Sequence, residues 1–203
     1  MLLQTIAVME IKKSYLNGVN LKDLSDTINM VYAHPELATF RFRVNNQWID
    51  GSYNQSVIQE FYGAGQEDRS RKVPFIADND LPGALIGTDQ APSPSENFLH
   101  ALAGCLTTTM VYHATANGYK LNNVRTHLEG DLNLKGFLGI DPGTRPGFRE
   151  IRVFIELDGD LSDAEKEEII QFGKAFSPVM DMITNRVPVR LEMRNRKITA
   201  EVV

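Results

Sequence analysis

The chain has 203 residues, 42% of them hydrophobic, so it is long and apolar enough to fold around a core of its own. Its 21 Lys and Arg residues against 26 Asp and Glu residues give a formal charge of −5, which argues against a nucleic-acid-binding surface. The single cysteine excludes an intramolecular disulfide and indicates a reducing, cytoplasmic location. We find no transmembrane-length apolar run and no signal-peptide pattern, and therefore expect no membrane partner.

The first part of the chain is predicted to be a helical extension over residues 1–37. The apolar side chains of residues 21–31 fall on one helical stripe, and Pro35 stops the helix because proline lacks the backbone N–H that a helix interior needs. We expect the remaining residues, 38–203, to form one domain.

Strand patterns open that domain. Residues 40–44 alternate between apolar side chains and arginine, which predicts a half-buried strand. Asn45 and Asn46 tolerate a positive φ, so they favour a hairpin turn into a second strand at residues 47–49. The Gly-, Pro-, Asp- and Ser-rich residues 63–95 predict a long connection, of the kind that carries function or covers an interface.

A long central helix follows. Ser93 is a good N-cap, Pro94 suits the first helical position and Glu96 completes a capping box, while Gly118 marks the end. The expected elements after it are strands at 124–134 and 148–157, a helix at 162–176, a short helix from 177, and a strand pair near 187–193 and 198–202. This order predicts an α+β fold in which a mainly antiparallel sheet packs on the central helix.

Cys105, the only cysteine, lies in the middle of the central helix. The 3.6-residue period places Phe98 and Thr109 on the same face. Gly104 beside it costs about 1 kcal/mol relative to alanine inside a helix, which suggests a packing or site requirement. Two interpretations stay open: a small buried hydrophobe, as free cysteines commonly are, or a reactive thiol.

No metal site or other cofactor is expected, because one cysteine and four scattered histidines match no zinc-ligand spacing.

The segment SPSENFLHALAGCLTTTMVYHATANG resembles the central helix of the OsmC/Ohr family, the osmotically induced and organic hydroperoxide resistance proteins. The later segment FSPVMDMITNRVPVRLEM falls where that family expects it, and the resemblance covers roughly residues 38–203. It implies an intertwined homodimer with two active sites at the subunit interface. It also implies thiol peroxidase activity on organic hydroperoxides without a metal.

The resemblance assigns roles to individual residues. Cys105 matches the peroxidatic cysteine that becomes a sulfenic acid. Ser177 stands where the family has a second, resolving cysteine, so the chain resembles a branch that lacks this cysteine. A hydroxyl cannot form a disulfide, but Ser177 can N-cap the short helix and line the substrate pocket together with Phe98 and Thr109.

The family also uses a glutamate and an arginine to activate the thiol. Its glutamate lies ten residues before the cysteine; Ser95 occupies that position here, and Glu96 follows it. Its arginine lies near the first hairpin, where Arg43 is the nearest candidate. The candidate catalytic residues are therefore Cys105, Glu96 and Arg43.

Three functions remain as alternatives. In the first, the protein is a one-cysteine thiol peroxidase in which Arg43, or an arginine of residues 63–77, activates Cys105 and an external thiol reduces the sulfenic acid. In the second, it is a non-catalytic relative that binds a small apolar ligand in the inter-subunit pocket. In the third, weaker alternative, it is a structural protein whose N-terminal helix serves the dimer.

Overall fold

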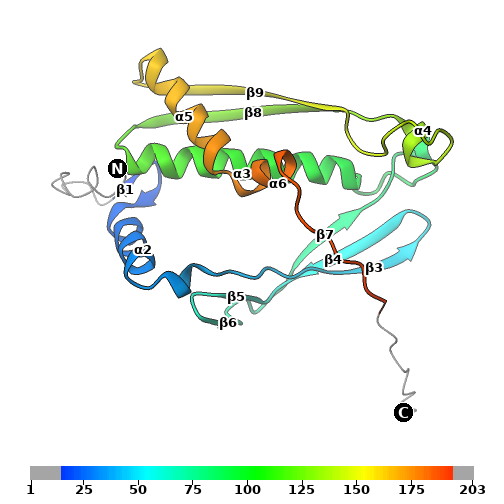
Figure 1. The fold of residues 1–203 in the computed structure, drawn as a ribbon, viewed down its shortest axis with the longest axis horizontal. Coiled ribbons are helices and arrows are strands. Elements are labelled where there is room, and N and C mark those ends of the chain that lie inside the picture. The colour runs from blue at the N-terminus through cyan, green and yellow to red at the C-terminus, as the bar shows by residue number, and fades with distance from the viewer. Residues whose placement is uncertain (1–14, 194–203) are drawn as a thin grey trace, which may run out of the picture.

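A long helix, α3, organises the fold. The computed structural model describes residues 15–193, and it confirms the predicted α+β arrangement of antiparallel strands around one long helix (Figure 1). Helix α3 spans Pro94–Ala116. The Ser93 hydroxyl accepts the Glu96 N–H, and the Glu96 carboxylate accepts the Ser93 N–H, so the predicted capping box starts the helix. Gly118, at φ 80°, follows its C-terminal end.

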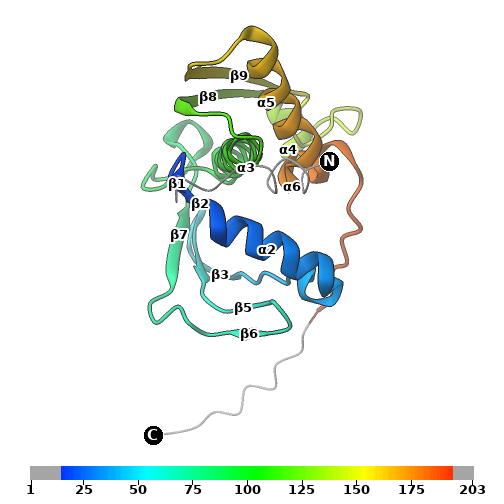
Figure 2. The same cartoon turned by 90° about the vertical axis from the view of Figure 1, so that its left-hand side faces the viewer.

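A hairpin and two helices form a layer on one side of α3. Strands β8 (Leu121–Asp131) and β9 (Glu150–Gly159) pair antiparallel, and the short helix α4 (Leu134–Phe137) lies in their connection. Helices α5 (Asp163–Phe176) and α6 (Pro178–Thr184) also pack on α3. Figures 1 and 2 show this upper layer, with the hairpin above α3 and the two helices beside it.

The hydrophobic core lies between α3 and this upper layer. The buried residues of the core cluster are Leu102, Leu106, Met110 and Ala114 from α3 and Ile169 from α5. Gly173 lets α5 approach closely, because a Cβ added there would lie 2.9 Å from the Met110 Cγ. The core therefore fixes the position of α5 on α3, and with it the start of α6.

A second layer lies on the other side of α3 (Figures 1 and 2). Strands β3 (Asn45–Asp50), β4 (Tyr53–Ile58) and β7 (Phe75–Asn79) form an antiparallel sheet in the order β3-β4-β7. A small hairpin joins β5 (Phe61–Gly63) to β6 (Gln66–Asp68). No residue of β3, β4 or β7 is buried within this single chain.

The predicted hairpin turn at Asn45 and Asn46 is wrong. Strand β3 begins at Asn45, and the chain turns instead at Gly51, which has a φ of 52°. Asparagine tolerates the left-handed region, but glycine enters it without a side-chain clash, so glycine is the stronger turn former. Residues 40–44 form no strand, and among them only Arg41 makes a bridge, with Tyr62.

The N-terminal extension contains the predicted helix. A short hairpin of two strands, β1 (Tyr15–Leu16) and β2 (Val19–Asn20), precedes helix α2 (Leu21–Ala33). The 3-10 helix η1 (Pro35–Ala38) follows it, so α2 ends just before Pro35, as expected.

Asn17 ties this extension to the C-terminal end of α3. Its amide donates to the Thr115 hydroxyl at 3.0 Å and to the Tyr119 carbonyl at 2.8 Å. Its side-chain oxygen accepts the Leu121 N–H at 2.9 Å. Asn17 has a φ of 51°, a conformation that asparagine tolerates better than most residues.

The loop between β7 and α3, which includes the 3-10 helix η2 (Gly83–Leu85), is built around Asp80. This side chain is only 1% exposed. Its carboxylate accepts hydrogen bonds from the hydroxyls of Ser52 and Thr88 and from the N–H groups of Leu81, Thr88 and Gln90. These bonds, led by the two hydroxyls, hold the pKa of Asp80 well below its usual value.

The predicted strand at residues 187–193 is wrong for the single chain, because no strand is present there. Its alternating apolar residues, Val187, Val189, Leu191 and Met193, are 53–95% exposed. A strand needs a hydrogen-bonded neighbour, and this segment has none within the described part of the chain. The expected partner strand at 198–202 lies outside the described residues.

Candidate functional site

The structure places Cys105 where α3 meets the start of α6. The thiol is half-buried. Its sulfur accepts a hydrogen bond from the Ser177 hydroxyl at 3.1 Å and one from the Val179 N–H at 3.5 Å. The sulfur, the atom that attacks when a cysteine acts as a nucleophile, is therefore held by two donors at the start of α6.

Local sequence explains how Ser177 reaches this position. It follows the last residue of α5 and N-caps α6, because its hydroxyl oxygen accepts the Met180 N–H at 3.3 Å and Pro178 occupies the first helical position. This capping role was predicted from the sequence. The side chain is 2% exposed, so the hydroxyl is held inside the protein beside the thiol.

Phe98 and Thr109 share the face of α3 that carries Cys105. Phe98, about two turns before the cysteine, is 42% exposed and packs on Phe148 with ring centroids 6.1 Å apart. Thr109 lies one turn after the cysteine and is half-buried. The thiol is therefore flanked along the helix by an aromatic and a hydroxyl side chain.

Glu96 lies away from the thiol within one chain. It precedes Cys105 by nine residues, which corresponds to about two and a half turns and about 13 Å along the helix. Hydrogen bonds from the side chain and backbone of Ser93 hold the pKa of Glu96 below its usual value. Glu96, Asn97, His100 and residues 89–92 line an open cleft of about 660 Å³.

Arg43 is paired with Glu67 on the other layer. Two parallel hydrogen bonds of 2.7 Å join the guanidinium to the carboxylate. The side-chain hydrogen bonds between them raise the pKa of Arg43 and lower the pKa of Glu67. Within residues 15–193, no hydrogen bond joins Arg43 to Cys105, so one chain brings together Cys105 and Ser177 but not Arg43 or Glu96.

Sequence reasoning missed the Val179 N–H as a contact of the thiol. The available signal was the Ser177-Pro178 helix start, but Val179 is 74 residues from Cys105, and their contact depends on how α5 and α6 pack on α3.

His113 is a second unusual group near this region. Its ring stacks on Phe176 with centroids 4.5 Å apart, and its buried Nδ1 has no hydrogen-bond partner among the described residues. Burial lowers the pKa of His113, so the ring is neutral near pH 7 and acts as a packing group.

Residues 15–193 contain no group of three or more His, Cys, Asp or Glu side chains arranged to hold a metal ion. Over the same residues, no helix combines the length and apolar character needed to cross a bilayer.

Solved structures share this fold. An OsmC-like protein from Mycoplasma pneumoniae superimposes with a TM-score of 0.56 at 19% identity, covering 72% of this chain and 89% of that one. A protein from Psychrobacter arcticus 273-4 gives a TM-score of 0.52 at 14% identity, covering 68% and 85% of the two chains. At these identities the likeness shows the fold. No curated protein matches the sequence.

The family assignment comes from the sequence itself. Residues 87–192 match the family model described as OsmC-like protein. These residues include α3, the β8–β9 hairpin, α5 and α6, and they lie inside the domain predicted over 38–203, whose boundary at residue 37 stays a prediction. The match spans the thiol, the capping serine beside it and the core that holds them together, and the chain belongs to the OsmC-like protein family.

Proposed function

We propose that this protein is a one-cysteine thiol peroxidase that reduces organic hydroperoxides in the cytoplasm with an external thiol as reductant. The observation that carries the proposal is the half-buried Cys105 sulfur, which accepts hydrogen bonds from Ser177 and Val179 at the start of α6. Family membership supports the same chemistry. No residue in the chain can supply a second thiol.

The reaction balances in two stages. The Cys105 thiolate attacks one oxygen of the peroxide; an S–O bond forms, the O–O bond breaks, and the alkoxide leaves as an alcohol after taking up a proton. Cysteine is thereby oxidised to a sulfenic acid. One external thiol then forms a mixed disulfide with release of water, and a second external thiol displaces Cys105 and leaves as a disulfide.

The organic part of the substrate is proposed to lie along the α3 face of Phe98 and Thr109, with Ser177 at its edge. An exposed aromatic ring two turns along α3 from the thiol favours an alkyl or aryl hydroperoxide over hydrogen peroxide.

A second copy of the chain is part of the proposal. The sheet β3-β4-β7 has no buried residue, and Phe40, Phe42 and Phe75 are exposed on the same layer. Exposed apolar surface of this kind typically marks an interface. We propose that a homodimer covers it, and that Arg43 of one chain approaches Cys105 of the other while Glu96 orients the arginine.

The proposal is tested by mixing reduced protein with one equivalent of tert-butyl hydroperoxide and trapping with a sulfenic-acid probe, followed by intact mass. Labelling of the wild type, and none in Cys105→Ser, supports a peroxidatic thiol. An unlabelled wild-type protein whose thiol also alkylates slowly would overturn it.

Arg43 can be tested in the same assay. Replacing Arg43 by alanine is expected to slow labelling of Cys105 by about tenfold or more, because a guanidinium stabilises both the thiolate and the developing alkoxide. Arg69→Ala is the matched control, since Arg69 lies near the same small hairpin and pairs with Glu60 at 3.7 Å. Equal rates in the two variants would remove Arg43 from the mechanism.

The alternative function is a non-catalytic relative that binds a small apolar ligand in the inter-subunit pocket. The pairing of Arg43 with Glu67 favours it, because an arginine held by two 2.7 Å bonds is less free to activate a thiol. This alternative becomes the working function if the sulfenic-acid probe fails.

A further inference from the structure

Ser177 is unlike the other serines that N-cap helices in the described part of the chain. Ser93 and Ser162 both belong to capping boxes, in which a glutamate three residues later accepts the serine N–H. The Ser162 hydroxyl also donates to that glutamate, Glu165, at 2.8 Å. Ser177 has Met180 at the equivalent position, so no carboxylate at that position accepts a hydrogen bond from the Ser177 hydroxyl.

The Ser177 hydroxyl instead donates its hydrogen bond to the Cys105 sulfur. A serine hydroxyl carries one donor and can accept two bonds. Its oxygen accepts the Met180 N–H at 3.3 Å, and its hydrogen is donated to the Cys105 sulfur at 3.1 Å. Because the side chain is 2% exposed, water does not compete strongly for this donor.

The backbone around Ser177 fixes its orientation. The Ser177 N–H donates to the Gly173 carbonyl at 3.2 Å, and its own carbonyl accepts the Asp181 N–H at 3.0 Å. Gly173 is the residue at which α5 approaches Met110 of α3. Ser177 is thus connected through one turn of α5 to the core of the fold. Met110 of that core lies on α3, the helix that also carries the thiol.

We propose that Ser177 is a positioning residue of the thiol site, in addition to its role as a helix cap. Its hydroxyl donates to the Cys105 sulfur and holds it in place before reaction. After oxidation the same hydroxyl and the Val179 N–H, which already donate to the sulfur, can donate to the sulfenate. This inference rests on the proposed function for its biological meaning, but the hydrogen bond itself can be tested without any peroxide.

The test compares pH profiles of Cys105 alkylation by iodoacetamide in full-length wild type, Ser177→Ala and Ser162→Ala. Both variants remove one N-cap serine, but only the first removes a donor to the thiol. Ser177→Ala is expected to slow alkylation across the profile, by about tenfold at pH 7, the size expected for one hydrogen bond to a charged group. Ser162→Ala is expected to match the wild type.

A Ser177→Ala profile that overlays the wild type would overturn the proposal, and so would an equal slowing in Ser162→Ala. Ser177→Thr keeps the hydroxyl and the cap, and it should restore the wild-type profile; failure of this variant, when circular dichroism shows it folded, also counts against the inference. Peroxide labelling is scored separately: slowed alkylation of Ser177→Ala without sulfenic-acid formation in the wild type would retain the positioning role and reject the peroxidase.

Discussion

The hydroxyl of Ser177 and the thiol of Cys105 lie 3.1 Å apart, so a single atomic replacement would create a dithiol. We predict that Ser177→Cys forms an intrachain disulfide with Cys105 when one equivalent of alkyl hydroperoxide is added, because sulfur atoms already in contact need only a small movement to reach the bonding distance of about 2.05 Å. Intact mass after alkylation without reductant measures it. Ser162→Cys is the control, and a disulfide in both variants, or in neither, would contradict the geometry.

Asp80 gives a prediction about acid stability. Hydrogen bonds from Ser52 and Thr88 hold the pKa of Asp80 below the value of about 3.9 expected in an unfolded chain. Ionised Asp80 therefore stabilises the fold above about pH 4, and this contribution is lost as the pH falls from there toward the folded-state pKa.

Asp80→Asn should accordingly lower the melting temperature most at pH 7, and the difference from wild type should shrink below about pH 4. Asp89→Asn, an exposed residue of the same loop, should behave like the wild type at every pH. A difference between Asp80→Asn and wild type that stays constant from pH 7 to pH 3 would contradict the assignment.

Single elements show where sequence reasoning succeeded. Helices α3, α5 and α6 were predicted because each begins with a serine cap, and capping depends only on residues within one turn. The turn at Gly51 was missed because Asn45 and Asn46 offered a competing local signal. Residues 187–193 have a strand pattern without a strand, because pairing depends on a neighbour that the sequence pattern does not reveal.

The candidate site, too, could be predicted from the sequence only in part. Cys105 and its helical face could be read from the periodicity of α3, because residues one or two turns apart share a face. The hydrogen bond from Ser177 to Cys105 joins residues 72 apart, and it exists only because α5 packs on α3 at Gly173. Contacts between distant residues of this kind follow from packing, which no local pattern encodes.

At the scale of elements, Asn17 is the main polar connection of the N-terminal extension to α3 and β8. Replacing it by alanine removes three hydrogen bonds and leaves the Leu121 N–H without its partner. We expect Asn17→Ala to lower the free energy of unfolding by about 2–3 kcal/mol and to make α2 sensitive to limited proteolysis.

The control for Asn17→Ala is Asn20→Ala, which removes only the N-cap of α2 and should cost about 1 kcal/mol. Urea denaturation gives the free energies, and mass spectrometry of the fragments locates the cleavage. Equal costs for the two variants would mean that Asn17 does not anchor the extension.

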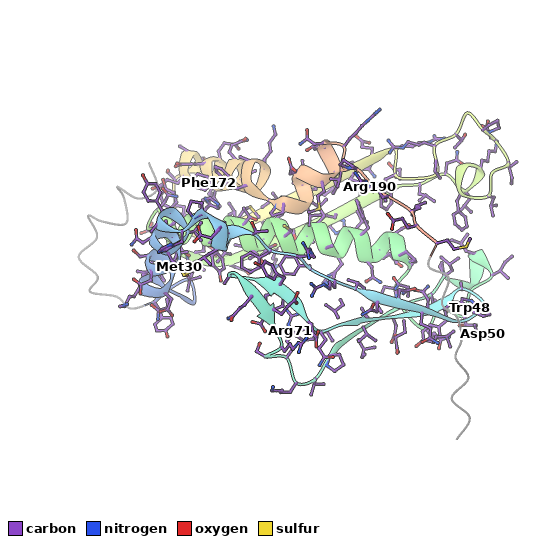
Figure 3. All side chains as sticks on the ribbon, turned by 60° about the horizontal axis from the view of Figure 1, so that its bottom comes forward. Met30, Trp48, Asp50, Arg71, Phe172 and Arg190 are labelled. Atoms are coloured by element: carbon purple, nitrogen blue, oxygen red, sulfur yellow. The ribbon has the colours of Figure 1, made fainter. Side chains whose placement is uncertain are left out.

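The molecule as a whole has two layers with α3 between them (Figures 1 and 2), and its core lies on one side of α3 only. Trp48 and Arg71, labelled in Figure 3, belong to the layer without that core. Its exposed side gives a prediction about assembly. A Cβ added at Gly104 meets no atom within 4 Å in the single chain, so Gly104→Ala should stabilise a free helix by about 1 kcal/mol. Against the face of a second copy, the same methyl group would prevent close approach.

We therefore predict that wild-type protein has twice the mass of one chain in light scattering, and that Gly104→Ala weakens this dimer. Gly83→Ala, which also adds a methyl group where nothing lies within 4 Å, should leave the dimer unchanged. A monomeric wild type would reject the homodimer, and a more stable Gly104→Ala dimer would place the interface elsewhere.

The single cysteine has a consequence for how oxidation of this protein can be observed. Every disulfide that the chain can form joins it to a different molecule, so each such bond adds the mass of that molecule. If the protein is isolated from its native cells and separated on a non-reducing gel, its redox partners should therefore appear as discrete adducts that a reductant releases. The mass of each adduct would then help to identify the natural electron donor.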